Sequence, residues 1–227
     1  RSAAVRRTTP PTPPMPDAPA APKAGKVSEN LGARLRQGRE QSGITVRELA
    51  RRIGVSASLV SQIERSRVMP SVGTLFAITN LLGLVIDDLF KVDGAERGKR
   101  AVQTSSGPVQ KHHNRKAIQM AAGVRWERLT AQPDPEVEFL YVVYGAGAAS
   151  CREDALFQHG GKEYAYLLSG RLGVRIGFDD YELGPGDAIS FDAQLPHRLW
   201  CIGREPAIAI WTIIRRRGDS RQPAAQP

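Results

Sequence analysis

The chain has 227 residues, of which 41% are hydrophobic and 24% charged, and its formal net charge is +9. The length allows two modest domains with separate cores, and the basic charge favours an anionic partner, with nucleic acid first. The sequence has no run of about 18 apolar residues, no secretory signal and only two cysteines, so we expect a cytoplasmic protein with no membrane partner and no disulfide framework.

Composition divides the chain into five segments. Residues 1–28 are rich in proline and poor in large apolar side chains, which predicts a disordered arm. Residues 29–92 have helical periodicity, and residues 117–215 consist of short alternating runs that predict antiparallel strands. The polar stretch between them, 93–116, is expected to be a linker, and 216–227 a basic flexible tail. The predicted fold class is therefore α + β, with two domains.

The helical segment has signals for five helices. Hydroxyl side chains that can cap a helix precede the second, third and fourth, and Thr45 with Glu48 matches a capping box. Gly54 would end the second helix, because the tight reversal there needs a positive φ. Two short helices joined at a glycine form a helix-turn-helix unit. The residues expected to begin or end the helices are, in chain order, Leu31, Gln41, Thr45, Gly54, Ser56, Ser71, Leu82, Ile86 and Phe90.

Residues 30–90 resemble the DNA-binding domain of phage repressors and Cro, the XRE type. The stretches that carry the resemblance are Glu48-Leu49-Ala50, Gly54-Val55-Ser56, Ser61-Gln62-Ile63-Glu64-Arg65, Pro70-Ser71 and Asp88-Leu89-Phe90. The resemblance implies that the second helix of the motif lies in the major groove of operator DNA, with its first residues at base edges. It also implies an ion pair between Arg39 and Glu64 that ties the first helix to this recognition helix.

The same resemblance implies which residues contact DNA. Gln62 can form two hydrogen bonds to adenine, and the neighbouring small side chains can contact either base class or a thymine methyl group. Residues just outside the recognition helix are better placed for phosphates, which position the protein without reading sequence. The expected contacts are Ala57, Ser58, Ser61 and Gln62 at bases, Arg65, Arg67 and Thr45 at phosphates, and the cap residue Ser56.

The strand-rich segment resembles the cupin family, which implies an antiparallel jelly-roll barrel over about residues 117–214. In the first motif, Glu163 alternates with Ala165 and Leu167 onto one face, and Gly170 makes a turn. The motifs that carry the resemblance are His159–Gly170, Tyr181–Phe191 and Leu195–His197.

Cupins commonly hold a metal with two histidines spaced His-x-His, a glutamate and a later histidine. Glu163 matches the glutamate, His159 the second histidine and His197 the last, whereas Phe157 stands at the first position. In the second motif Cys201 replaces the usual asparagine. The three remaining ligands would suffice for zinc, iron or nickel.

A metal-free pocket that uses the same polar groups is the alternative, and a purely structural role for the two histidines is a third interpretation. We expect an effector site at His159, Glu163 and His197. Its predicted aromatic walls are Phe157, Tyr166 and Trp200.

Together, the two halves predict a sequence-specific transcription regulator and not an enzyme. It would bind double-stranded operator DNA as a homodimer and sense a small-molecule effector or a metal in its cupin domain. Two alternatives stay open, namely a cupin oxygenase or isomerase with a DNA-binding appendage, and a cupin that serves only to dimerise the chain. Phe157 argues against the enzyme, because redox or Lewis-acid chemistry usually needs the full ligand set.

Overall fold

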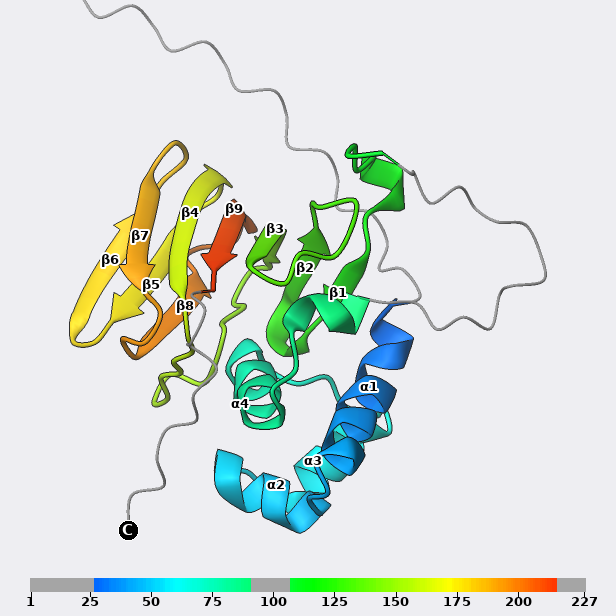
Figure 1. Cartoon of the computed structure of the whole chain (residues 1–227). Helices are drawn as coiled ribbons and strands as arrows, with labels where there is room; N and C mark the ends of the chain where they lie inside the picture. Colours follow the sequence, from blue (N-terminus) through cyan, green and yellow to red (C-terminus); the bar gives the residue numbers. More distant parts are fainter. Residues whose placement is uncertain (1–26, 91–106, 216–227) are drawn as a thin grey trace, which may run out of the picture.

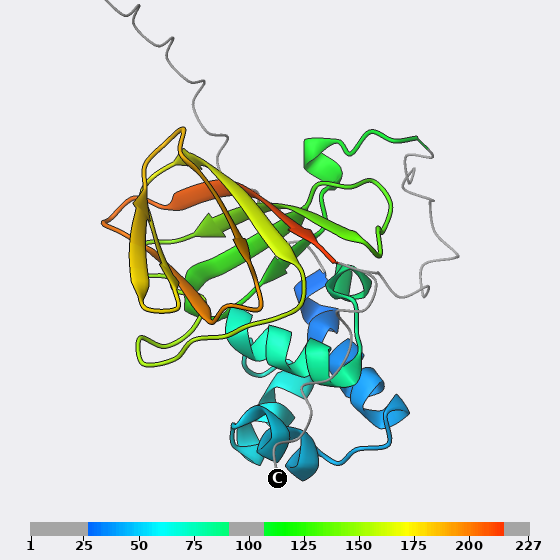
Figure 2. The same cartoon turned by 60° about the vertical axis from the view of Figure 1, so that its left-hand side comes forward.

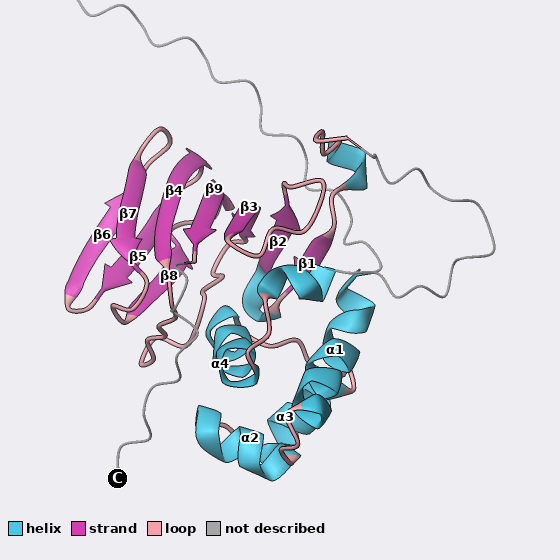
Figure 3. Ribbon diagram, viewed as in Figure 1, coloured by secondary structure: helices cyan, strands magenta, loops and turns pink. Residues whose placement is uncertain are grey.

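The computed structural model describes residues 27–90 and 107–215, which form a helical part and a β part that follow each other along the chain (Figures 1 and 3). Nearly all of the predicted arm, most of the predicted linker and the whole predicted tail lie outside the described residues. Within the described residues, no helix combines the length and the apolar character needed to cross a bilayer.

The helical part contains four α-helices and one short 3-10 helix. They are α1 (Val27–Gln41), α2 (Val46–Ile53), α3 (Ala57–Glu64), α4 (Val72–Leu82) and η1 (Ile86–Phe90). The prediction of five helices was wrong in its last member, because five residues with two central aspartates, which are weak helix formers, complete only a 3-10 turn. The first helix begins at Val27 and not at Leu31, since apolar spacing marks only the buried turns of a helix.

Three of the helices begin at hydroxyl side chains, which accept hydrogen bonds from backbone N–H groups that lack a partner within the helix. Thr45, Ser56 and Ser71 each accept a bond of 3.1 Å from the N–H three residues further on. Gly54 ends α2 with φ 70° and ψ 31°, the left-handed conformation that glycine adopts without steric cost. The carboxylate of Glu48 pairs with arginine side chains of α2, so the second half of the predicted capping box does not form.

The β part has two antiparallel sheets. The larger contains, in spatial order, β1 (Ala117–Gln119), β2 (Val124–Arg128), β3 (Val137–Tyr144), β9 (Ala207–Ile214), β4 (Lys162–Ser169) and β7 (Ala188–Asp192). The smaller contains β6 (Asp179–Leu183), β5 (Leu172–Ile176) and β8 (His197–Cys201). Two 3-10 turns, η3 (His112–Asn114) and η4 (Ala121–Gly123), flank β1.

The two sheets face each other across a common core (Figure 2). Among residues 107–215, no ladder joins the sheet edges, so the predicted barrel is an open sandwich and not a closed one. Isolated bridges from Ala149 to Trp200 and from Phe157 to His197 tie the segment before β4 to the smaller sheet. Alternation in a sequence shows which side chains face inward but not which strand edges pair, and this is why closure could not be predicted.

The helical and β parts are not separate cores, although the length of the chain allowed two. Their buried side chains form one continuous cluster, and α4 lies against the β part (Figure 2). The Gly73 N–H donates to the Ser150 carbonyl at 3.0 Å, and the Ala121 N–H donates to the Pro70 carbonyl at 2.9 Å. A Cβ atom on Gly73 would lie 3.2 Å from the Cβ of Phe157, so the two backbones approach closely at this glycine.

Candidate functional site

The helix-turn-helix presents part of α3 to solvent. Ser58 is exposed and Ser61 and Gln62 are half-buried, whereas Val60 and Ile63 face the core. Gln62 Nε2 donates a hydrogen bond of 3.2 Å to Ser58 Oγ, so these two side chains lie next to each other on the helix surface. All four predicted base contacts lie on α3. The first of them, Ala57, packs partly against the core.

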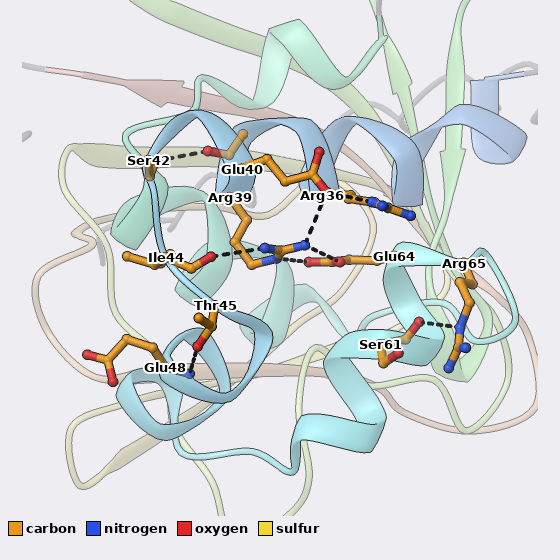
Figure 4. Close-up of polar contacts among 11 residues, drawn as sticks. Arg36, Arg39, Glu40, Ser42, Ile44, Thr45, Glu48, Ser61, Glu64 and Arg65 are labelled. Carbon is orange, nitrogen blue, oxygen red and sulfur yellow. Dashed lines mark hydrogen bonds and ion pairs between the residues drawn. The ribbon is translucent and has the colours of Figure 1, made fainter.

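The predicted phosphate contacts lie at the ends of α2 and α3. Thr45 and Ser56 are exposed, and their hydroxyl groups cap the two helices. Arg65 Nε donates to the Ser61 carbonyl at 3.1 Å, so its side chain folds back over the last turn of α3 (Figure 4). Arg67 is exposed two residues further on.

Arg39 and Glu64 form a two-pronged ion pair between α1 and the end of α3 (Figure 4). The two N–O distances are 2.6 and 3.0 Å, and the side chains are only 10% and 6% exposed. A third guanidinium nitrogen of Arg39 donates to the Ile44 carbonyl at 2.9 Å, in the segment before α2. The hydrogen bonds to Glu64 raise the pKa of Arg39 further above its usual range. One side chain therefore connects α1, the segment before α2, and the end of α3.

A second polar site lies inside the β part, where His159, Glu163 and His197 come together. They are 5%, 2% and 0% exposed, and their ligand atoms all lie within 4.8 Å of one another. Glu163 is on β4, His159 precedes that strand, and His197 begins β8 in the opposite sheet. Glu163 Oε1 lies 2.7 Å from His159 Nε2 and 3.7 Å from His197 Nε2.

Backbone carbonyl groups orient both imidazole rings. His159 Nδ1 lies 3.0 Å from the Gly160 oxygen, and His197 Nδ1 lies 2.8 Å from the Leu195 oxygen. When Nδ1 carries the proton, each ring donates it to its carbonyl, and the Nε2 lone pair points into the site. Neither buried Nε2 atom has a partner in hydrogen-bond geometry. The second oxygen of Glu163 accepts a bond of 3.0 Å from Trp211 Nε1.

Burial and pairing act in opposite directions on these groups. Burial disfavours the charged form of His159, but the contact with Glu163 outweighs it and raises the pKa of this histidine. Burial would raise the pKa of Glu163, and the contact with His159 outweighs it and lowers that pKa. The more distant His197 has a lowered pKa, because burial dominates there. The site therefore favours a carboxylate beside one neutral and one readily protonated imidazole.

A cavity of about 20 Å³ adjoins Glu163, which is room for about one water molecule. Its walls come from both sheets and from α4, and they are Val72, Phe76, Trp126, Val142, Tyr144, Phe157, Glu163, Leu199, Trp211 and Ile213. Phe157 is a wall, as predicted. Tyr166 and Trp200 are not, because each is an odd number of residues from the site residue on its strand and so points to the opposite face. Tyr166 is 42% exposed, and Trp200 lies under the guanidinium of Arg198.

Sequence reasoning missed Phe76 and Trp211. The Phe76 ring on α4 stacks on His159 with ring centroids 3.8 Å apart and planes 8° apart. The signal for Phe76 was that α4 is apolar on more than one side, which is typical of a helix buried between two partners. The signal for Trp211 was its alternation with Ala209 and Ile213 on one face of β9.

The three polar side chains fit a divalent metal ion. Two Nε2 atoms and a carboxylate oxygen converge, and each imidazole has the outer hydrogen bond that metal-bound histidines usually make. Phe157 stands where cupins commonly have a fourth ligand, and its ring centroid lies 4.2 Å from that of His197. His159, Glu163 and His197 would therefore hold the ion with positions left open for other ligands.

Residues 30–99 match the family described as "Helix-turn-helix domain", and residues 148–213 match the family described as "Cupin domain". The chain is similar to the HTH-type transcriptional regulator PuuR of Escherichia coli (strain K12), with 22% identity over 166 residues that cover 73% of this chain and 84% of PuuR. The values for PuuR of Shigella flexneri are the same. An HTH_3 family transcriptional regulator from Vibrio cholerae shares the fold, with a TM-score of 0.59, 20% identity, and coverage of 84% of this chain and 98% of that chain.

Proposed function

We infer that this chain, a transcription regulator in which a helix-turn-helix domain precedes a cupin domain, reads operator DNA through α3 and senses a ligand at the buried polar site. The observation that supports sensing is the convergence of two buried Nε2 atoms on one oxygen of Glu163, where His197 Nε2 lies 3.7 Å from that oxygen and has no hydrogen-bond partner. Buried polar groups without partners are costly, so such a group is retained where a ligand supplies the partner. Phe157 in place of a fourth ligand favours sensing over catalysis, and we propose no enzymatic role. We place the protein in the cytoplasm, with the DNA.

Base reading and phosphate binding can be separated by two substitutions. Gln62→Ala is expected to reduce discrimination at one base step by about 1–3 kcal/mol, because a paired amide is lost. Arg67→Ala is expected to weaken binding to all sequences alike and to reduce the salt slope of log Kd by about one unit. Binding to a randomised duplex library at several salt concentrations measures both effects. A uniform loss with both variants would contradict the assignment of α3 as the reading helix.

The ligand of the buried site is either a metal ion or a small polar molecule bound by the same groups. A bound metal would supply a Lewis-acidic centre with open positions for an oxygen or nitrogen of an effector. His159, Glu163 and His197 would hold it, and Trp211 would fix the orientation of the carboxylate through its indole N–H.

Zinc, ferrous iron and nickel ions, together with a set of small organic acids and amines, provide the test of sensing. At least one is expected to raise the melting temperature of the full chain and to change operator affinity about 5- to 150-fold, the usual range of coupling between sites. His159→Ala/Glu163→Ala should remove both responses. His112→Ala/His113→Ala is the matched control, because these histidines are exposed. A double variant at the buried site that responds like the wild type would place the sensor elsewhere.

We propose a homodimer that forms through the outer face of the larger sheet. Two cross-strand rows run over β3, β9, β4 and β7, the first made of Phe139, Thr212, Tyr164 and Ser190 and the second of Tyr141, Ile210, Tyr166 and Ala188. Phe139, Tyr164 and Tyr166 are 38–42% exposed, and a groove of about 340 Å³ runs along the face. The occupant that we propose is a second copy of this chain, because operator recognition by a single helix-turn-helix motif needs two half-sites.

The double substitution Tyr164→Glu/Tyr166→Glu is expected to convert the dimer to a monomer, because two buried charges would face each other across the interface. Sedimentation velocity should show the mass halved at micromolar concentration. Tyr181→Glu is the control, since this tyrosine is 47% exposed on the smaller sheet. Wild-type protein that sediments as a monomer would contradict the dimer, and an effect of Tyr181→Glu equal to that of the double variant would contradict the face.

A further inference from the structure

One wall of the buried site belongs to the DNA-binding part of the chain. Phe76 is on α4 and is 2% exposed, and its ring lies flat on the imidazole of His159. It also stacks with Phe157, at a centroid distance of 5.6 Å, and meets the edge of Trp126 at 5.8 Å. A residue of the helix-turn-helix domain therefore forms part of the wall of the cupin site.

The space that Phe76 leaves is too small for an organic ligand. The cavity measures about 20 Å³, whereas pockets that hold small molecules measure about 300–1,000 Å³. The walls other than Phe76, Val72 and Phe157 are strand residues, whose positions the two sheets fix, and an isolated bridge to His197 ties Phe157 to the smaller sheet. α4 is therefore the part of the wall that can move.

Phe76 cannot leave the site without its helix. The first turn of α4 is held to the β part by the Gly73 N–H bond to Ser150, and Gly73 approaches Phe157 with no room to spare. Leu75 and Ile78 of the same helix are buried in the continuous core, and α4 also packs against α1 and α2. A movement of α4 away from the sheets therefore carries the helix-turn-helix with it.

We propose that Phe76 and an organic ligand of the buried site compete for the same space, so that such a ligand binds only when α4 leaves the β part. This inference rests on the proposed function and adds its mechanism. Ligand binding then releases the DNA-binding part from the cupin, and the orientation of α3 changes with it. By the reciprocity of linked equilibria, DNA binding must change the affinity for the ligand by the same factor as the ligand changes DNA affinity, and the position of α4 must differ between free and DNA-bound protein.

A disulfide can hold α4 in place without enlarging the site. A Cβ atom on Gly73 would lie 3.4 Å from the Cβ of Cys151, close to the separation of about 3.5–4.5 Å found in disulfides. Gly73→Cys, oxidised in the full chain, should therefore lock α4 onto the β part through the native thiol of Cys151. The same variant after reduction is the unlocked control, and Gly73→Cys/Cys151→Ser cannot form the link.

Access to the cavity is measured as the rate at which diethyl pyrocarbonate modifies each histidine, followed by mass spectrometry. The reagent is larger than the cavity and needs neither DNA nor effector, so failure here is distinguishable from failure of the proposed function. His112 and His113 are exposed and serve as internal standards. The Cys201 thiol, buried in β8, reports unfolding of the β part through its reaction with a maleimide.

The locked protein should be modified at His159 and His197 at least tenfold more slowly than the reduced protein, with no change at the two standards. Phe76→Ala should accelerate modification of the same two histidines severalfold, and Phe76→Leu, which keeps more of the core, should do so less. Addition of operator duplex should change the rate in the wild type but not in the locked protein. The proposal is overturned if the lock leaves the rate unchanged, if it slows Cys201 to the same extent, or if an operator duplex that binds the wild type leaves the rate unchanged.

Discussion

Replacement of Arg39 by leucine is expected to lower the free energy of unfolding by about 3 kcal/mol. The reason is the charge that remains. Glu64 is buried, and both of its oxygens bind the Arg39 guanidinium. The Ile44 carbonyl loses its donor at the same time. Urea unfolding of the full chain, followed by the circular dichroism of the helices, measures the change.

Arg36→Leu is the control for this prediction. Arg36 pairs with Glu40 on the same helix at 2.8 Å, but the two side chains are 58% and 51% exposed. Water and salt screen such a pair, so its loss should leave the urea midpoint where it was. The double variant Arg39→Leu/Glu64→Leu should recover much of the lost stability, because no unpaired charge remains. Equal effects of Arg39→Leu and Arg36→Leu would show that the buried pair is not the cause.

Gly32→Ala is expected to lower the free energy of unfolding by about 2 kcal/mol, although the helix propensity of alanine is more favourable than that of glycine by about 1 kcal/mol. A Cβ atom on Gly32 would lie 2.3 Å from the Ile63 carbonyl oxygen and 2.9 Å from that of Glu64. These are backbone atoms at the end of α3, so the new methyl group would force α1 and the recognition helix apart. The same urea titration measures the loss.

Gly38→Ala separates this steric effect from helix propensity, since Gly38 lies on the same helix. The three atoms nearest to its Cβ would all belong to the side chain of Leu84, namely both methyl groups and Cγ, and this side chain can change its rotamer. We expect Gly38→Ala to keep or slightly raise the stability. If both alanine variants destabilise equally, the close approach of α1 to α3 is not what requires glycine at position 32.

The helix-turn-helix could be predicted in detail because its signals are local. The hydroxyl caps at Thr45, Ser56 and Ser71 and the left-handed Gly54 depend on residues within one turn, and the structure confirms them. The prediction of a fifth helix also depended on local signals, and it was wrong. The Ile86–Phe90 stretch is apolar enough for a helix but too short to complete an α-helix. The order of helices before strands followed from the change of periodicity alone.

The cupin site was predictable only in part. The set of His159, Glu163 and His197 was implied by the resemblance to cupin motifs, and the structure brings the three side chains together. The assignment of Tyr166 and Trp200 as walls conflicted with the two-residue period of a strand. That period already places Tyr166 on the opposite face from Glu163, and Trp200 on the opposite face from His197. Phe76 lay beyond the reach of the sequence for a different reason. Helical periodicity shows that a side chain is buried but not which distant element covers it.

The position of α4 between the two parts of the core limits how regulators of this architecture can diversify. The helix packs against α1 and α2, and its Phe76 stacks on His159 of the cupin. A recombination event that joins this DNA-binding part to a foreign cupin would leave Phe76 without a fitted socket and open the foreign sensor to water. The heritable unit is therefore the cupin together with the α4 surface that covers it. On the proposed sensing function, new effector specificities that keep operator control should arise by paired changes at positions such as 76 and 157, and not by exchange of intact modules.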